Sequence, residues 1–133
     1  MNKEIALETA MSVINTNNHA LLGTLSMEDF PNIKALTKIK HEGIKVFYFM
    51  TNPISTKVEQ IKQNNKTCVY FFDPIRYIGI LLEGTAEIQD ENYIGELNIP
   101  KPDALSYNEY CAIIFTTNKA TVYYNYEKIT FEV

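Results

Sequence analysis

The sequence predicts a mainly β (α+β) fold, an antiparallel barrel of six or seven strands with two short flanking helices. Short segments rich in β-branched and aromatic residues follow one another in meander order, and only two segments clearly show the apolar spacing of a helix. Closing such a sheet into a barrel removes its exposed edges. A chain of 133 residues builds one hydrophobic core, so residues 1–133 are expected to form a single domain.

The first half of the chain is expected to form a helix, an antiparallel meander and a second helix. The first helix is expected where apolar residues show helical spacing, and it stops at a run of asparagine and threonine that favours caps and turns. The expected elements are a helix over 4–16, strands over 20–26, 33–39 and 44–51, turns at 27–31 and 41–43, and an amphipathic helix from Thr56 to about Asn64.

The second half is expected to add the remaining strands. Gly79 and Gly84 interrupt the long strand over 77–88, where they indicate bends or bulges. The other expected elements are a strand over 67–73, one or two helical turns over 90–97, a loop over 100–106, a hairpin formed by 111–117 and 119–126 around Thr117-Asn118, and an extended end over 129–133.

Composition argues against several classes of protein. The net charge of −4 is spread along the chain without a basic patch, so a nucleic-acid binder is not expected. No apolar stretch approaches the roughly 18 residues that span a bilayer, and the N-terminus lacks the pattern of a signal peptide. A cytoplasmic protein is therefore expected, in which Cys68 and Cys111 are buried free thiols rather than a disulfide. His19 and His41 have no ligand-type neighbours at metal-binding spacing, so no metal site is expected.

The segment over 47–65 carries the most informative chemistry. A strand ends at Thr51, a tight turn follows, and Ser55-Thr56-Lys57 opens the second helix. Free backbone amides, hydroxyl groups and one ammonium meet there, which is the donor set that a phosphate monoester needs, and Lys34 could add a second cation. An alternative stays open: Thr56-Lys57-Val58-Glu59 also fits a capping box, in which these groups only terminate the helix.

Residues 19–88 resemble the pyridoxamine-phosphate oxidase-like flavoproteins, and most closely their general-stress-protein branch. The resemblance rests on several motifs that are moderately specific in combination. They are Gly23-Thr24-Leu25, Pro31 to Lys34, Thr51 to Lys57 with Ile61 and Asn64, and Gly84-Thr85-Ala86-Glu87. The resemblance implies a split β-barrel that binds flavin mononucleotide (FMN), and a homodimer with the flavin at the subunit interface.

The same resemblance implies which residues hold the cofactor. Lys34 takes the place of an arginine that contacts the FMN phosphate, while Ala35 and Leu36 run along the flavin ring. Met50 and Thr51 contribute backbone and hydroxyl contacts, and the phosphate is held by Ser55, Thr56 and Lys57. Tyr107, Tyr123 and Tyr124 either line the ring pocket or pack in the barrel or an interface, and packing is the favoured interpretation.

Three residues depart from the family pattern. Lys34 replaces an arginine, which weakens bidentate phosphate binding. Thr56 stands where the classical oxidases often have a second arginine, and Phe30 replaces a turn glycine. The chain also has no tryptophan and a single arginine, Arg76, so it lacks the segment with which the classical oxidases bind pyridoxal phosphate.

These observations lead to a functional hypothesis with an alternative. The chain is expected to be an FMN-dependent oxidoreductase that reduces a small electrophile or free flavin with a nicotinamide donor, and not a true pyridoxamine-phosphate oxidase. The residues predict no catalytic acid or base. The alternative is a non-enzymatic flavin-binding, haem-type ligand-binding or stress protein on the same barrel, because function resides in the site rather than in the fold. A barrel that has lost its cofactor is a weaker, third possibility.

Overall fold

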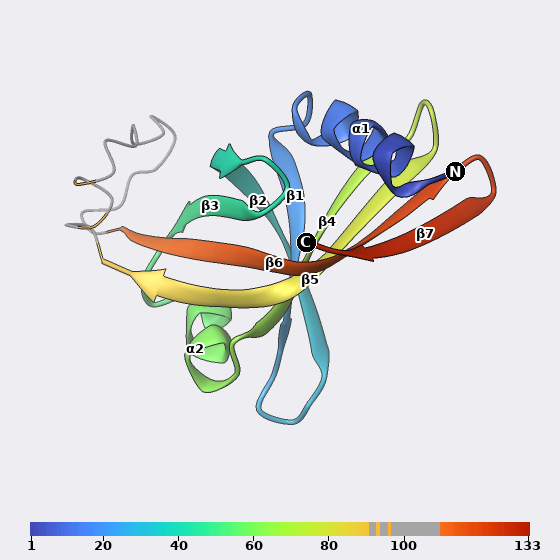
Figure 1. The fold of residues 1–133 in the computed structure, drawn as a ribbon. Coiled ribbons are helices and arrows are strands. Elements are labelled where there is room, and N and C mark those ends of the chain that lie inside the picture. Colours follow the sequence, from blue (N-terminus) through green and yellow to red (C-terminus); the bar gives the residue numbers. More distant parts are fainter. Residues whose placement is uncertain (91–92, 94–95, 97–109) are drawn as a thin grey trace.

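The computed structural model describes residues 1–90, 93, 96 and 110–133. Within them a helix, three strands, a second helix and four more strands follow one another (Figure 1). The elements are α1 (Lys3–Ile14), β1 (His19–Leu25), β2 (Pro31–Glu42), β3 (Val46–Thr51), α2 (Thr56–Gln63), β4 (Lys66–Asp73), β5 (Ile78–Gln89), β6 (Cys111–Tyr124) and β7 (Glu127–Glu132).

Six of the strands close into an antiparallel barrel, which confirms the predicted fold class. The sheet runs in the order β3-β2-β1-β4-β5-β6-β7, and a further pairing of β3 with β6 closes it. The first half of β6, residues 111–116, pairs with β3, whereas its second half, residues 119–124, pairs with β7. Strand β7 is therefore an extra strand beside the barrel.

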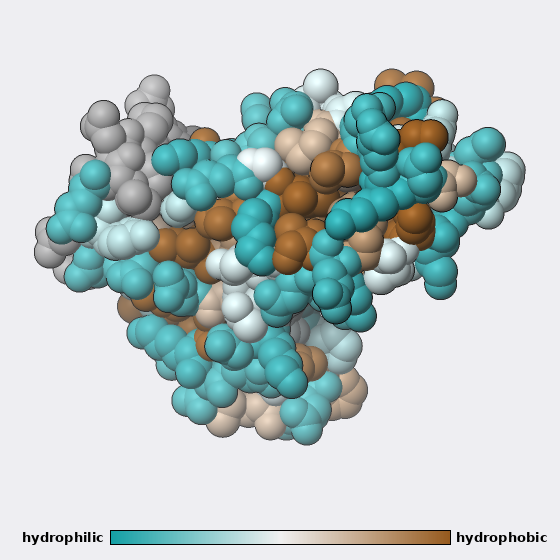
Figure 2. Space-filling view, in the orientation of Figure 1, coloured by the Kyte–Doolittle hydropathy of each residue, from teal (hydrophilic) through white to brown (hydrophobic). Residues whose placement is uncertain are grey.

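The core fills the barrel and continues beneath α1. Side chains that alternate along the strands point inward, and the largest fully buried ones are Phe47, Phe49, Phe71 and Phe115. Helix α1 adds small and branched residues at helical spacing, including Ala6, Ala10 and Val13, to the same cluster. In Figure 2 hydrophobic residues gather between α1 and β6, with hydrophilic residues around them.

Side chains form hydrogen bonds with backbone groups at both ends of α1. At its start, the backbone amide of Ile5 donates to Asn2 Oδ1 over 2.9 Å. At its end, the buried Lys38 Nζ donates to the carbonyl of Ile14 over 2.7 Å, which places a cation at the negative end of the helix dipole. Burial lowers the pKa of Lys38. Helix α1 is thereby attached to β2 as well as packed against the core.

The hairpin predicted around Thr117-Asn118 is wrong, because β6 continues through these residues. Glu83 pairs with Lys119 and Gly84 pairs with Thr117, which leaves Asn118 as the extra residue of a bulge. The chain turns later, at Asn125 and Tyr126, whose φ angles of 54° and 61° are those of a tight hairpin turn.

Other expectations agree with the structure or lie outside its described part. The second helix has the predicted start, and both cysteines are free, although Cys68 is only half-buried. Most of the segment over 90–97, all of the loop over 100–106 and Tyr107 lie outside the described residues. Among the described helices, none combines the length and the apolar character that a membrane span needs.

Candidate functional site

The wall of the barrel is open between β2 and β3. Strand β2 pairs with β3 only from Lys38 onward. From Pro31 to Thr37 it pairs with β1 on one edge, and no strand of the described chain pairs with its other edge. At the matching end of β3, Met50 and Thr51 pair with β6 and not with β2. The first half of β2 therefore has one edge without a partner strand among the described residues, and we refer to this opening as the split.

A cavity of about 420 Å³ lies where the split meets the start of α2. We refer to it as the α2 cavity. Strands β1 and β2 and the start of α2 all contribute to its walls. The lining residues are Thr24, Asn32, Ile33, Lys34, Ser55, Thr56, Lys57 and Gln60.

Two interactions fix α2 beside this cavity. Val58 and Ile61 are almost fully buried on the inner face of the helix. Between them in the sequence, Gln60 is also buried, and its Oε1 accepts a hydrogen bond from Thr24 Oγ1 over 2.5 Å. The helix is therefore held to β1 by a buried polar contact as well as by packing, so its first turn has a fixed place at the opening.

The start of α2 leaves donors without acceptors. Ser55 is the N-cap residue, yet its side chain makes no capping hydrogen bond. Its Oγ is buried and has no hydrogen-bond partner in the described part of the chain. The amides of Thr56 and Lys57 belong to the first helical turn, which has no intrahelical acceptors for them. A buried hydroxyl in this condition costs about 1–3 kcal/mol unless a ligand supplies the partner.

The capping-box interpretation does not fit this helix start. A capping box requires Thr56 as the N-cap residue and Glu59 three positions later. In the structure the N-cap residue is Ser55 and Thr56 is the first helical residue, so the residue at the third position is Val58. Valine has no group that could bond back to the N-cap amide. The hydroxyls and amides at the start of α2 are thus not used up by a reciprocal cap.

The α2 cavity carries positive charge. Lys34 reaches it from β2, and Lys57 from the first turn of α2. Burial lowers the pKa of Lys57, and the nearby ammonium of Lys34 lowers it further, while Cys111 has a smaller, opposite effect. No carboxylate of the described residues forms an ion pair with either lysine. Two cations in one cavity without a counter-ion, together with a helix N-terminus, fit an anion.

The donor set of the α2 cavity suits a phosphate in particular. Two ammonium groups match the charge of a phosphate monoester, which is close to −2 at neutral pH. The hydroxyls of Ser55 and Thr56 and the free amides add short, directional donors. The residues present therefore fit the phosphate of a nucleotide-type cofactor such as FMN.

The structure brings some of the predicted site residues together and places others nearby. Lys34, Ser55, Thr56 and Lys57 line one cavity, although they come from two separated segments. Ala35, which is exposed, and Leu36, which is partly buried, continue along the open part of β2.

Met50 and Thr51 are buried at the end of β3, and neither lines the α2 cavity. The Thr51 carbonyl accepts a hydrogen bond from Cys111 Sγ over 3.7 Å. Met50 packs in a second apolar cluster on the other face of the strand, with Tyr48, Tyr110, Ala112 and Ile114.

Sequence reasoning missed half of the cavity's lining residues: Thr24, Asn32, Ile33 and Gln60. Signals for two of them were present in the sequence alone. Asn32 is two residues from Lys34 and so lies on the same face of β2, and Gln60 lies one helical turn after Thr56. Thr24 pairs with Asn32 across the β1–β2 hairpin, which the pairing register of that hairpin would have given.

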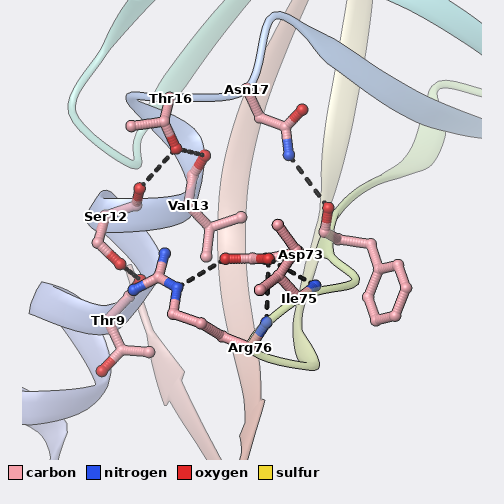
Figure 3. Close-up of polar contacts among 9 residues, drawn as sticks. Thr9, Ser12, Val13, Thr16, Asn17, Asp73, Ile75 and Arg76 are labelled. Carbon is pink, nitrogen blue, oxygen red and sulfur yellow. Dashed lines mark hydrogen bonds and ion pairs between the residues drawn. The ribbon is translucent and has the colours of Figure 1, made fainter.

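The structure shows the surroundings of Phe30 and Arg76, two residues that bear on the departures from the family pattern. The turn between β1 and β2 needs a left-handed residue, and Asp29 with φ 64° takes that role, so Phe30 needs no glycine-like conformation. Arg76 lies in the turn between β4 and β5, where its Nε contacts Asp73 Oδ2 at 2.6 Å, near α1 (Figure 3).

Tyr123 and Tyr124 do not lie at the α2 cavity. Tyr123 and Tyr124 share a groove with Arg76 and Tyr77 and contribute no lining residue to the α2 cavity.

Comparisons with known proteins agree with this fold. Residues 6–99 match the family model described as pyridoxamine 5'-phosphate oxidase. A protein from Clostridium acetobutylicum related to general stress protein 26 of B. subtilis has 31% identity and a TM-score of 0.84, with 100% of this chain and 97% of that chain covered. The comparison with curated proteins gives no match.

Two more distant solved structures share the fold. A pyridoxamine 5'-phosphate oxidase-related, FMN binding protein from Nostoc punctiforme has 11% identity and a TM-score of 0.71, covering 100% of this chain and 97% of that one. A heme binding protein from Mycobacterium smegmatis has 14% identity and a TM-score of 0.78, covering 96% of this chain and 57% of that one. With the family model matching most of the chain, this protein belongs to the pyridoxamine 5'-phosphate oxidase-like family, and general stress protein 26 is among its relatives.

Proposed function

We propose that the protein binds FMN, with the phosphate in the α2 cavity. The observation that carries this proposal is the buried, unpartnered Ser55 Oγ beside two lysines and free helix amides. Ser55, Thr56 and Lys57 would hold the phosphate from the helix side, and Lys34 from the side of β2. These residues anchor the cofactor and take no part in electron transfer.

The open edge of β2 is where we expect the flavin ring to bind. Ala35 and Leu36 follow Lys34 directly, in the part of β2 whose outer edge has no partner strand among the described residues. Backbone amides and carbonyls on that edge need hydrogen-bond partners, and the ring of a flavin presents both donors and acceptors. Met50 and Thr51, at the end of β3, would close the other side of the ring through their backbone and the Thr51 hydroxyl.

The activity that this site supports best is a flavin-dependent reduction. Bound FMN would supply the electron chemistry, taking electrons from a nicotinamide and passing them to a small electrophile or to free flavin. The chain's own task is to bind and orient the cofactor. The side chains that line the α2 cavity are hydroxyls, amides, lysines and one isoleucine, which suit the anchoring of an anion.

A true pyridoxamine-phosphate oxidase is not part of this proposal. Besides FMN, such an enzyme would have to bind pyridoxal phosphate, which would require further basic and aromatic residues. The chain has no tryptophan. The single arginine, Arg76, is engaged with Asp73 in the turn between β4 and β5. A substrate other than a pyridoxal phosphate compound therefore fits better.

The proposal includes a homodimer with the flavin between the subunits. The outer edge of β2 from Pro31 to Thr37 has no partner strand among the described residues, so one chain alone would leave part of a flavin ring uncovered. A second copy would cover the exposed face. Size-exclusion chromatography with light scattering tests this part: the expected mass is twice 15.3 kDa, and a monomer that binds FMN with full affinity would contradict it.

A non-enzymatic ligand-binding protein is the second candidate. Its support is the fold shared with a heme binding protein. For a haem, however, the chain offers two histidines, and His41 Nδ1 already contacts the Gly43 carbonyl at 2.8 Å while its ring stacks on Phe47. The α2 cavity, with its lysines, matches a phosphate better than a haem iron.

Absorption spectroscopy tests the proposal. Titration of the purified protein with FMN is expected to perturb the flavin spectrum with saturation, and NADH or NADPH is then expected to be consumed in steady turnover with an electron acceptor. A spectrum that FMN leaves unchanged would refute the binding site. Saturable binding without turnover would favour the non-enzymatic candidate, and a Soret band that appears only on adding haem would favour a haem binder.

A further inference from the structure

A large groove lies between the β4–β5 turn and the β6–β7 turn, and it shares no lining residue with the α2 cavity. It has a volume of about 880 Å³, and we refer to it as the tyrosine groove. Its walls combine aromatic rings with basic side chains. They include Tyr77, Tyr123, Tyr124 and Tyr126, together with Arg76 and Lys128.

The rings of the tyrosine groove are not part of the core. Tyr77 is 75% exposed and Tyr126 is fully exposed, while Tyr123 and Tyr124 are 40% and 39% exposed. Phe72 extends the same surface, because its ring meets the Tyr77 ring edge-on at a centroid distance of 5.3 Å. Contiguous apolar surface of this kind is rare on monomeric proteins and marks places where a ligand or partner binds.

Two of the tyrosines occupy backbone positions that disfavour them. Tyr77 and Tyr126 have φ angles of 55° and 61°, in the left-handed region, where a bulky side chain is crowded by its own backbone. Asn125 tolerates its φ of 54°, and glycine after it would give the pair that such a hairpin turn favours most. The exposed ring of Tyr126 gains no burial that would offset the strain. Stability does not explain this tyrosine, and strain of this kind is typical of functional sites.

The tyrosine groove has an excess of hydrogen-bond donors. In the described part of the chain, none of its four tyrosine hydroxyls has a hydrogen-bond partner. Arg76 uses Nε to contact Asp73 and keeps its terminal amino groups (Figure 3). Lys128 forms no ion pair with a carboxylate of the described residues. The acid that lines the groove, Glu127, already contacts the N-terminal ammonium of Met1 at 3.5 Å.

These properties indicate a ligand that accepts hydrogen bonds, donates few, and presents apolar rings to the tyrosines. A proline-rich segment in the polyproline II conformation has all three properties. Its carbonyls have no internal partners, proline has no N–H, and the pyrrolidine rings pack well in aromatic-lined grooves. A sugar fits less well, because its hydroxyls bring as many donors as acceptors.

The dimensions of the sheet agree with such a ligand. Tyr123 on β6 pairs with Gly79 on β5 and with Lys128 on β7. Three neighbouring strands span about 10 Å, which is close to one turn of a polyproline II helix, about 9 Å. A segment that crosses these strands would bring one proline per turn to the tyrosines and leave Lys128 free for an acidic residue.

We propose that the tyrosine groove binds a proline-rich segment of another protein, with prolines between the tyrosine rings and an acidic residue at Lys128. The two turns then have a common role, since each holds one strained tyrosine at the groove. This interaction is separate from the α2 cavity and does not depend on whether FMN binds there.

Fluorescence anisotropy of the full chain with a labelled synthetic peptide tests the proposal. The peptide contains two P-x-x-P turns and a terminal pair of glutamates. Saturable binding is expected, about tenfold tighter than that of a glycine–serine peptide with the same glutamates. Tyr77→Ala and Tyr126→Gly are each expected to weaken binding about fivefold. Tyr126→Gly also relieves the strained turn, so it is expected to raise the midpoint of thermal unfolding while it weakens binding.

Two further variants make the test specific. Phe30→Ala removes an exposed aromatic ring at the β1–β2 turn and is expected to leave peptide binding unchanged. Lys128→Gln is expected to weaken binding about threefold for the peptide with glutamates and not for the same peptide with glutamines. FMN binding is expected to be the same in Tyr77→Ala, Tyr126→Gly and Lys128→Gln as in the wild type.

The proposal is overturned if the proline-rich peptide binds no more tightly than the glycine–serine peptide, or if its binding survives both tyrosine variants. Selective binding of an oligosaccharide would also overturn it and assign the groove to a sugar. Self-association of the chain that disappears in Tyr126→Gly would assign the groove to a second copy instead.

Discussion

Lys57 is the residue whose charge state the account depends on most. It is partly buried at the α2 cavity, beside Lys34, and both burial and that neighbour hold its pKa below the usual 10.5. Keeping it protonated without an anion is thus less favourable than for an exposed lysine. A bound phosphate would remove this cost, so ligand binding and protonation of Lys57 should favour each other.

FMN affinity is therefore expected to depend on pH in the alkaline range. A bound phosphate raises the pKa of Lys57, so the affinity is full below the pKa of the free protein and falls as the pH rises through it. Because that pKa lies below 10.5, the loss begins at a lower pH than for an exposed lysine. Fluorescence titrations at a series of pH values measure this. Lys57→Arg should move the loss to higher pH; an unchanged profile in Lys57→Arg would contradict the assignment.

The lysine at position 34 leads to a second prediction at this scale. An arginine offers a planar, bidentate group to a phosphate, which a lysine ammonium cannot. Lys34→Arg is therefore expected to tighten FMN binding several-fold, by about 1 kcal/mol. Lys40→Arg, at an exposed position of the same strand, is the control and should have no effect. Equal changes in both variants in a calorimetric titration would show that Lys34 has no special place at the phosphate.

Residue roles were partly readable from the sequence. Ser55, Thr56 and Lys57 could be placed together at the start of the second helix, because hydroxyl residues directly before an amphipathic segment mark a helix N-terminus. Which hydroxyl terminates the helix could not be decided, because Ser55 and Thr56 are equally good caps and the difference is one residue in the helix boundary. Thr24 could not be identified as a lining residue without the register of the β1–β2 hairpin.

At the scale of elements, the contact between β1 and α2 determines where the helix N-terminus lies. The buried hydrogen bond from Thr24 to Gln60 is a polar link in an otherwise apolar contact. Thr24→Val or Gln60→Leu alone leaves one buried polar group unpaired and is expected to cost about 1–3 kcal/mol of unfolding free energy.

The double variant Thr24→Val/Gln60→Leu completes a mutant cycle for this link. It is expected to cost less than the sum of the single variants, because no unpaired group remains. Urea denaturation followed by circular dichroism measures all three changes. Additive effects would show that the two side chains do not interact.

The bulge in β6 leads to a prediction about Gly84. A Cβ at this position would collide with the backbone carbonyl oxygen of Thr116, which cannot move without disturbing β6. Gly84→Ala is expected to destabilise the protein by about 1–3 kcal/mol or more. In Gly79→Ala the collision is with the Tyr70 hydroxyl, at the end of a rotatable side chain, so a smaller loss is expected in thermal unfolding. The reverse order would contradict the bulge.

The same bulge explains why a hairpin was expected in the wrong place. Thr117-Asn118 has the local composition of a turn, and nothing nearby in the sequence distinguishes a turn from an unpaired bulge residue. Whether these residues form a turn or a bulge is determined by pairing with strand β5, where Gly84 allows the backbone of β6 to approach closely. Conversely, the true turn at Asn125 and Tyr126 has a tyrosine where glycine is usual, so its composition gave little signal.

For the whole molecule, the mainly β class and the barrel could be predicted because the strands follow one another as a meander and a closed sheet protects their edges. The pairing that closes the barrel could not be predicted in detail. Strand β6 pairs with both β3 and β7, and both pairings require its full length of 14 residues. The predicted hairpin divided this strand into two shorter ones.

The proposed function of the whole molecule rests on one geometrical result of this closure. Strand β3 leaves β2 before the split, and the chain then enters α2 with its free amides at the opening. The barrel thus combines a strand edge without a partner in the described chain and a cationic helix N-terminus in one place. We expect this place to hold the phosphate of a flavin.

Comparing FMN with riboflavin tests that claim most directly, since the two ligands differ only by the phosphate. Fluorescence titrations of the wild type and Lys57→Gln, with Lys62→Gln on the last turn of α2 as the matched control, measure both affinities. FMN is expected to bind more tightly than riboflavin. The Lys57→Gln change is expected to cost about 1–3 kcal/mol of FMN binding and to leave riboflavin binding unchanged. Equal affinities of the wild type for the two ligands, or equal losses for both in Lys57→Gln, would contradict it.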